Sequence, residues 1–121
     1  MNGSLTVTAG ANADIDFWHN IDYDGLTDIE NLTINAGDDI NIYKIYDSAT
    51  GSPDQLNIAL NADTDTDLTG DILLWDSITT GNGTYSASAF TYFGRSYVDG
   101  FGFHKVTVDT GTAGATITTS E

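Results

Sequence analysis

Short runs of alternating apolar and polar residues recur along the chain, and residues 31–42 show the pattern most clearly. Two triplets there, 32–34 and 40–42, place apolar side chains at positions i and i+2 with a polar side chain between them. Alternation with a period of two is typical of a β-strand that buries one face. Ala36-Gly37 separates the triplets, and a small residue followed by a glycine, which tolerates positive φ, suits a tight corner. The pattern predicts two short strands joined by a corner.

The same arrangement occurs elsewhere in the chain. The run 5–10, followed by 14–17, matches the run 32–37, followed by 39–42. A third copy begins at Leu56, and a looser fourth copy begins at Val106. Successive start positions are 27, 24 and 50 residues apart. The repeating unit is therefore about 25 residues long, with one start position obscured between Leu56 and Val106, and this length is typical of repeat architectures.

A unit of this length with short strands and Gly, Asn and Asp corners predicts one coil of a parallel β-helix. Each strand would pair with its equivalent about 4.8 Å away, so matched side chains should stack. We expect two inward ladders, Leu5, Leu32, Leu56 and Val106 beside Val7, Ile34, Ile58 and Val108, and an outward row of Thr6, Thr33, Asn57 and Thr107. The alternative is an antiparallel β-sandwich, which also contains alternating strands at regular intervals. We prefer the β-helix because a sandwich does not require its strands to resemble one another.

Two strings carry a resemblance to a known family, namely Leu32–Ile42 and Leu56–Asp65. They resemble the repeats of filamentous-haemagglutinin-like large exoproteins, which bacteria export by two-partner secretion. The resemblance covers residues 4–84. It implies a right-handed β-helical shaft, a location outside the cell or on the bacterial surface, and roles in adhesion, surface display or contact with other cells. It brings no catalytic residues to this chain.

Residues 85–105 depart from the repeat and contain seven of the thirteen aromatic residues. Asp99-Gly100 lies between two short apolar runs, which predicts a β-hairpin with a two-residue type I′ turn, projecting from the shaft or capping it. We expect its aromatic rings to cover a sheet edge. The alternative is an exposed platform for a sugar or protein, with Tyr92, Phe93, Tyr97 and Phe101 as its ligand-binding residues. The chain is thus predicted to be one domain, with repeat coils at 4–84, this segment at 85–105 and a final coil at 106–121.

The charge of the chain restricts its partners. Among 121 residues, eighteen are acidic and three are lysine or arginine, which gives a formal net charge of -15. This charge argues against nucleic acids and anionic membrane surfaces as partners and favours cations. No cysteine is present, so disulfide and thiolate-metal frameworks are excluded. No apolar run approaches membrane-spanning length and the start is no signal peptide, so we expect a fragment of a longer exoprotein without membrane insertion.

An acidic segment supplies the candidate metal ligands, which are Asp63, Asp65, Asp67 and Asp71. The first three alternate, and calcium takes about six to eight oxygen ligands that such spacing can bring together. Leu68 stands where an EF-hand loop has its glycine, and the twelfth position carries no glutamate, so the segment is not an EF-hand. The two interpretations are a calcium site and a solvated corner. Other aspartates, among them Asp14, Asp38 and Asp39, are expected to lie in solvated turns and faces, and the alternative is that they too contribute ligands to calcium.

The remaining candidates indicate binding rather than catalysis. His19 and His104 are far apart in the sequence, which argues against a transition-metal site. Trp18 and Trp75 are expected to pack against the coils. The shortage of Lys, Arg and His argues against an enzyme, although some carbohydrate-active enzymes use β-helices and paired carboxylates. We predict a non-catalytic structural and adhesive segment of a large secreted bacterial surface protein.

Its partner would be a receptor or glycan on a host or neighbouring cell. A chain cut from a longer shaft should also associate end to end as salt or calcium rises. The alternative function, from another class, is a calcium-dependent carbohydrate-binding module that uses the aromatic segment.

Overall fold

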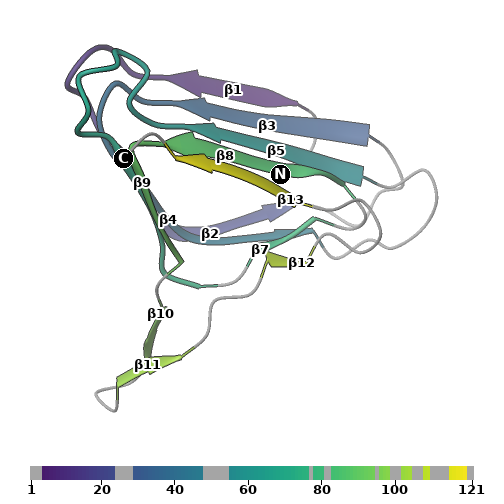
Figure 1. The fold of residues 1–121 in the computed structure, drawn as a ribbon. Coiled ribbons are helices and arrows are strands. Elements are labelled where there is room, and N and C mark those ends of the chain that lie inside the picture. The colour runs from purple at the N-terminus through teal and green to yellow at the C-terminus, as the bar shows by residue number, and fades with distance from the viewer. Residues whose placement is uncertain are drawn as a thin grey trace.

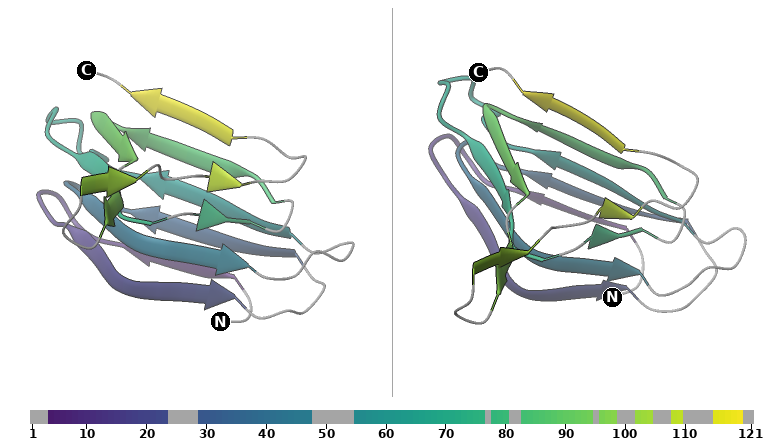
Figure 2. Two further views of the ribbon diagram at one scale, coloured as in Figure 1. Left: turned by 90° about the horizontal axis from the view of Figure 1, so that it is seen from below. Right: turned by 60° about the horizontal axis from the view of Figure 1, so that its bottom comes forward.

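The computed structural model describes residues 4–23, 29–47, 55–76, 78–80, 83–94, 96–98, 102–104, 108–109 and 115–119. This part of the chain is all-β and contains no helix, so none of it forms a helix that could cross a membrane. Two larger sheets face each other across a common interior (Figure 1; Figure 2). The prediction of an all-β domain is confirmed.

The first sheet has five strands in the order β1 (Leu5–Thr8), β3 (Ile29–Asn35), β5 (Gln55–Asn61), β8 (Tyr85–Ala89) and β13 (Ala115–Thr119). The second sheet has the order β12 (Val108–Asp109), β7 (Ile78–Thr79), β4 (Ile40–Asp47), β6 (Asp71–Leu74) and β9 (Thr91–Gly94), and β2 (Ile15–Tyr23) also pairs with β4. Every strand pair within these two sheets is parallel. The antiparallel arrangement of the alternative sandwich is therefore not found in either sheet.

The register confirms the first two predicted repeats and corrects the third. Leu5 lies opposite Leu32, as expected. Leu32, however, lies opposite Ile58 rather than Leu56. The alternation continues unbroken from residue 56 to residue 60, so a shift of two residues keeps the same side chains inward and cannot be distinguished by hydrophobicity alone. The matching corners Asn35-Ala36 and Asn61-Ala62 decide the register.

The predicted fourth repeat is wrong. Val108 lies opposite Ile78 in the second sheet, not in the ladder of Val7 and Ile34. The place expected for Val108 is taken by Ile117 of β13, which lies opposite Ala87.

The repeat between Leu56 and Val106, whose start the sequence obscures, is β8, where Tyr85 lies opposite Ile58. Both sheets thus continue past residue 84 through β8 and β9. The start of this repeat was obscured because β8 reads Tyr-Ser-Ala-Ser-Ala and buries Tyr85, Ala87 and Ala89 where the earlier strands bury Leu and Ile.

The interior between the sheets is a single apolar cluster. Strands of both sheets contribute fully buried side chains, such as Ile34 and Leu60 from the first and Ile42 and Ile72 from the second. Each side chain of this size contributes about 1.5–3 kcal/mol when removed from water. On β1 the apolar side chains are only half-buried, because this strand has a neighbour on one side only among the described strands.

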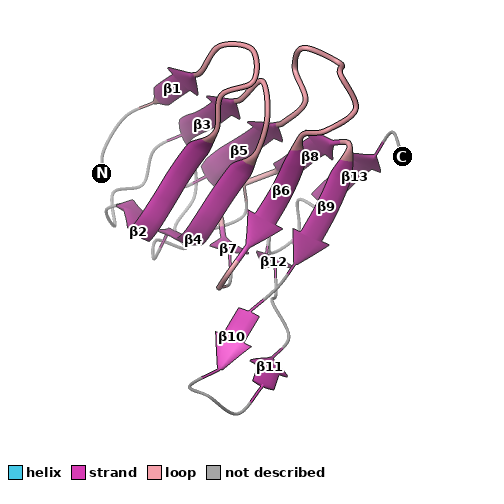
Figure 3. Ribbon diagram, turned by 90° about the vertical axis from the view of Figure 1, so that its left-hand side faces the viewer, coloured by secondary structure: helices cyan, strands magenta, loops and turns pink. Residues whose placement is uncertain are grey.

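A separate two-stranded sheet consists of β10 (Ser96–Val98) and β11 (Gly102–His104), which are antiparallel. The predicted hairpin is therefore present, and Figure 1 and Figure 3 draw it away from the two larger sheets. Its last pair is Val98 and Gly102. The expected turn at Asp99-Gly100 lies outside the described residues.

Candidate functional site

Two groups of acidic residues lie in the corners that join the first sheet to the second. Three corners, residues 9–14, 36–39 and 62–70, are stacked at the same end of the strands (Figure 3). The backbone N–H of Ala36 donates to the carbonyl of Asn61, 2.9 Å away, and that of Thr64 donates to the carbonyl of Ala36, 3.1 Å away. These bonds satisfy backbone groups outside the strands and bring acidic side chains of different repeats together.

The first acidic group consists of Asp63, Asp65 and Asp67, whose carboxylates offer oxygens that all lie within 4.8 Å of one another. The loop folds around these carboxylates. Asp63 Oδ1 accepts the backbone N–H of Leu68 at 3.1 Å, and Asp67 Oδ1 accepts both the N–H and the hydroxyl of Thr69, at 3.2 Å and 2.6 Å. Aspartate commonly caps turns in this way. The three predicted ligands are thus brought together, and the same carboxylates also stabilise the loop.

The backbone of this loop has an unusual conformation. Asp63, Thr66 and Leu68 have φ values of 54°, 60° and 71°. Positive φ is a real outlier for a β-branched or bulky residue, and here hydrogen bonds that Asp63 accepts hold two of the turns. Its carbonyl accepts the N–H of Thr66 at 3.0 Å, in addition to the side-chain bond to Leu68.

The fourth predicted ligand, Asp71, does not belong to this group. Its backbone N–H donates to Asp39 Oδ1 at 2.8 Å. The backbone N–H of Asp39 in turn donates to Asp14 Oδ1 at 3.1 Å. These three aspartates directly precede Ile15, Ile40 and Ile72, which are strand partners. They form a ladder in which one carboxylate holds the backbone of the next repeat.

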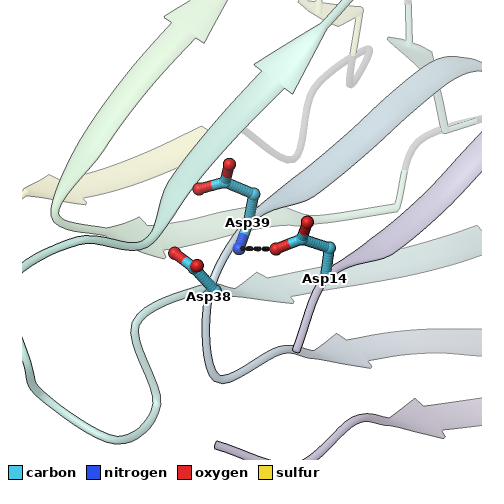
Figure 4. Close-up of side chains that lie close together, drawn as sticks. All are labelled: Asp14, Asp38 and Asp39. Carbon is cyan, nitrogen blue, oxygen red and sulfur yellow. Dashed lines mark hydrogen bonds between the residues drawn. The ribbon is translucent and has the colours of Figure 1, made fainter. Parts of the chain in front are cut away.

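The second acidic group consists of Asp14, Asp38 and Asp39, which were expected to lie in solvated turns. The carboxylates of Asp14, Asp38 and Asp39 also offer oxygens within 4.8 Å of one another (Figure 4). Burial and the charge of Asp39 raise the pKa of Asp38. Burial and the charges of Asp71 and Asp14 raise the pKa of Asp39, against a lowering by the hydrogen bond from the backbone of Asp71. A bound cation would offset this repulsion.

The sequence contained a signal for the second group. Asp14 and Asp39 occupy the same position in their repeats, one residue before strands that pair directly. Equivalent positions in stacked repeats lie close together, so a matched aspartate in each of two repeats predicts neighbouring carboxylates.

The predicted aromatic site is divided between sheets. Tyr92 and Phe93 lie in β9, opposite Ile72 and Leu73 of the second sheet, whereas Tyr97 lies in β10 of the hairpin. The side chains of these residues, and Phe101 as a whole, lie outside the described part of the structure. The structure therefore does not assemble these four residues into a site.

Exposed aromatic residues occur instead on the second sheet. Trp18 is 54% exposed and Tyr43 is 41% exposed. The ring centroids of Trp18 and Trp75 are 6.0 Å apart, with the ring planes inclined at 60°. We expected both tryptophans to pack against the coils, but Trp18 lies largely in solvent.

Comparison with protein-family models, curated proteins and solved structures found no match to this chain.

Proposed function

We propose that this chain is a non-catalytic structural and adhesive segment of a large secreted bacterial surface protein of the filamentous-haemagglutinin-like kind, built as a right-handed parallel β-helix. The observation that carries the proposal is the parallel pairing of strands one repeat apart, at Leu5 with Leu32 and Leu32 with Ile58. Consecutive strands alternate between the two sheets from β1 to β6. Such a chain winds around one apolar interior, as in a β-helical solenoid.

The side chains outside this interior support a structural role. Asn35 donates from Nδ2 to Thr8 Oγ1 at 3.3 Å, and Asn61 donates to Asn35 Oδ1 at 2.8 Å. A second row links Asn57 to Asn31 at 3.2 Å. Bonds between equivalent positions of successive repeats stiffen the stack along its axis, which suits a shaft that holds a binding surface away from the cell.

Adhesion by the folded chain tests this proposal. Beads coated with the protein would be incubated with cultured epithelial cells and with bacteria, and retained beads would be counted. The control is Ile34→Asp, which places a charge at a fully buried position and should unfold the chain. Retention that requires the fold supports the proposal, whereas equal retention of both proteins contradicts it.

As a second candidate we propose a calcium-dependent carbohydrate-binding module, which is favoured by the convergence of Asp63, Asp65 and Asp67. These three would supply part of the oxygen shell that calcium requires, with waters or backbone carbonyls as the remainder. A glycan array probed in calcium and in chelator tests this candidate. Glycan binding that chelator removes supports it, and binding that is unchanged or absent contradicts it.

A further inference from the structure

A row of aromatic residues crosses three neighbouring strands on the outer face of the second sheet. Phe17 of β2 lies opposite Ile42 of β4, which lies opposite Leu74 of β6. Each of these residues is followed by an aromatic residue. These are Trp18, Tyr43 and Trp75, which we call the aromatic row.

Trp18, the first member of this row, points outward in the normal alternation of β2, and an irregularity beside it turns His19 outward as well. The register shifts between Phe17 and Asn20, so that Trp18 and His19 together stand opposite Tyr43 alone. Two residues opposite one is the arrangement of a β-bulge, which redirects a side chain and occurs often beside functional sites. Trp18 and His19 are consequently both exposed.

The surroundings of the row are acidic. Asp16 and Asp22 are exposed on β2, and Asp76 directly follows Trp75. With a net charge of -15 on the whole chain, this face repels anions and attracts cations. A partner for it must therefore combine positive charge with a group that can lie against aromatic rings.

The chain itself places a cation on an aromatic ring of this sheet. Nζ of Lys44 lies 5.6 Å from the ring centroid of Tyr46, a side chain that is 41% exposed. This distance is within the range of a cation–π interaction. The second sheet thus already holds one such contact, and among the described residues the rings of the aromatic row take part in no cation–π pair.

We propose that the aromatic row binds an arginine-rich segment of a partner protein. Guanidinium groups would stack on Trp18 and Tyr43, the exposed rings of the row, and pair with neighbouring carboxylates such as Asp16. Arginine suits this surface better than lysine because its planar guanidinium stacks on aromatic faces and pairs with carboxylates through two hydrogen bonds. The inference names a partner chemistry for the proposed adhesive role and rests on that role for its setting.

The test is a titration of the folded protein at about 0.15 M salt. Binding would be followed by tryptophan fluorescence and calorimetry. The probes are acetylated and amidated hexa-arginine, hexa-lysine with the same charge, and cellohexaose as a neutral glycan. We expect hexa-arginine to bind more tightly than hexa-lysine. Trp18→Ala should weaken hexa-arginine binding about three- to fivefold and reduce the difference between the peptides.

Two further variants separate stacking from folding. Trp18→Phe retains an aromatic face and should restore most of the lost affinity. Ile29→Ala shortens a side chain that is 56% exposed on β3 of the first sheet, so it should leave hexa-arginine binding unchanged.

Three results would overturn the inference. The first is that the wild type does not bind hexa-arginine. The second is that hexa-arginine and hexa-lysine bind with equal affinity, both to the wild type and to Trp18→Ala. The third is that only cellohexaose binds, and that its binding requires Trp18. The bead assay does not use these probes. Failure of the inference would therefore leave the adhesive proposal standing, and failure of adhesion would leave peptide binding measurable.

Discussion

Asn61 donates a hydrogen bond of 2.8 Å from its side-chain Nδ2 to Oδ1 of Asn35, one repeat earlier in the chain. Asn35 is also the strand partner of Asn61 in the first sheet. A register shift of two residues would keep the same face of β5 inward but would separate these amides. The amide pair therefore selects the register that hydrophobic alternation leaves open.

Asn35→Ala should lower the free energy of unfolding by about 1–3 kcal/mol. The substitution leaves the half-buried Asn61 amide without its acceptor and also removes the bond to Thr8. Urea denaturation followed by circular dichroism measures the change. Thr33→Ala, two residues earlier on the same strand, is the control and should cost less than half as much. Equal losses would show that the amide pair does not stabilise the register.

Ile34→Asp and Thr33→Asp test which face of β3 is inward. Ile34 is fully buried between Val7 and Leu60, whereas Thr33 is only half-buried. Burying an unpaired carboxyl group costs several kcal/mol even when it takes up a proton, which is comparable with the roughly 5–15 kcal/mol by which a domain is usually stable. Ile34→Asp should therefore unfold the protein, and Thr33→Asp should lower its melting temperature by only a few degrees. Similar melting curves for the two variants would refute the assignment of the faces.

Local patterns in the sequence predicted part of the fold. The pairing of Leu5 with Leu32 followed from alternation and a shared Ala-Gly corner. The pairing of Leu32 with Ile58 did not follow, because a longer alternating run admits two registers. The predicted place of Val108 was wrong because the sequence of its strand resembles those of the first sheet, although the strand pairs in the second sheet. Alternation identifies strands and their faces, but backbone connections decide which sheet each strand joins.

In the candidate sites too, local patterns predicted contacts within one loop but not contacts between repeats. The convergence of Asp63, Asp65 and Asp67 depends on one loop, and their spacing was enough to predict it. Asp71 is close to Asp39 instead, which depends on stacking between repeats. The outward direction of Trp18 follows from alternation with Ile15 and Phe17, whereas the exposure of His19 depends on a β-bulge, which period-two alternation cannot predict.

Gly10 and Gly37 occupy matching positions in successive repeats. Replacing each by alanine should nevertheless change the free energy of unfolding by very different amounts. A Cβ at Gly37 would overlap the carbonyl oxygen of Gly10 and lie 2.6 Å from Cα of Ala11, whereas a Cβ at Gly10 meets nothing within 4 Å. Gly37 does not have a left-handed φ, so its glycine is required by close stacking rather than by the positive φ that the sequence suggested. We expect Gly37→Ala to cost about 1–3 kcal/mol.

Gly10→Ala should be neutral or slightly stabilising, because alanine restricts the unfolded chain more than glycine does. Thermal melts of both variants measure the contrast. A loss at Gly10 as large as that at Gly37 would contradict the stacked arrangement of the corners.

Tyr23→Phe should stabilise the protein and change its response to alkali. The Tyr23 hydroxyl is buried without a hydrogen-bond partner, so its removal should raise the free energy of unfolding by about 1 kcal/mol at neutral pH. Burial and the charges of Glu30 and Asp47 raise the pKa of Tyr23 to about 12. Above pH 10 the unfolded chain loses this proton first, which favours unfolding.

The stability difference between the Phe variant and the wild type should therefore widen from pH 10 to pH 12, by up to about 3 kcal/mol. Urea denaturation at several alkaline pH values measures it. Tyr43→Phe, at a side chain that is 41% exposed, is the control and should not show the widening. A difference that stays constant between pH 9 and about pH 12 would contradict the buried environment of Tyr23.

Calcium should raise the melting temperature if the acidic corners bind it. The raised pKa values of Asp38 and Asp39 mean that their ionised forms are disfavoured in the folded protein relative to the unfolded chain. Without calcium, stability should therefore decrease as the pH rises through the pKa values of these groups, and it should be partly regained on acidification. A cation that binds only the folded state would restore stability at neutral pH by mass action.

Two variants assign this response to a corner. Asp65→Asn with Asp67→Asn removes two charges from the first acidic group, and Asp38→Asn with Asp14→Asn removes two from the second. Asparagine keeps an oxygen for the turn hydrogen bonds, so each pair of substitutions changes charge more than shape. The calcium-dependent rise of several degrees should disappear only in the pair that holds the ion. Identical melting temperatures of the wild type in millimolar calcium and in chelator would mean that these carboxylates serve only to fold the corners.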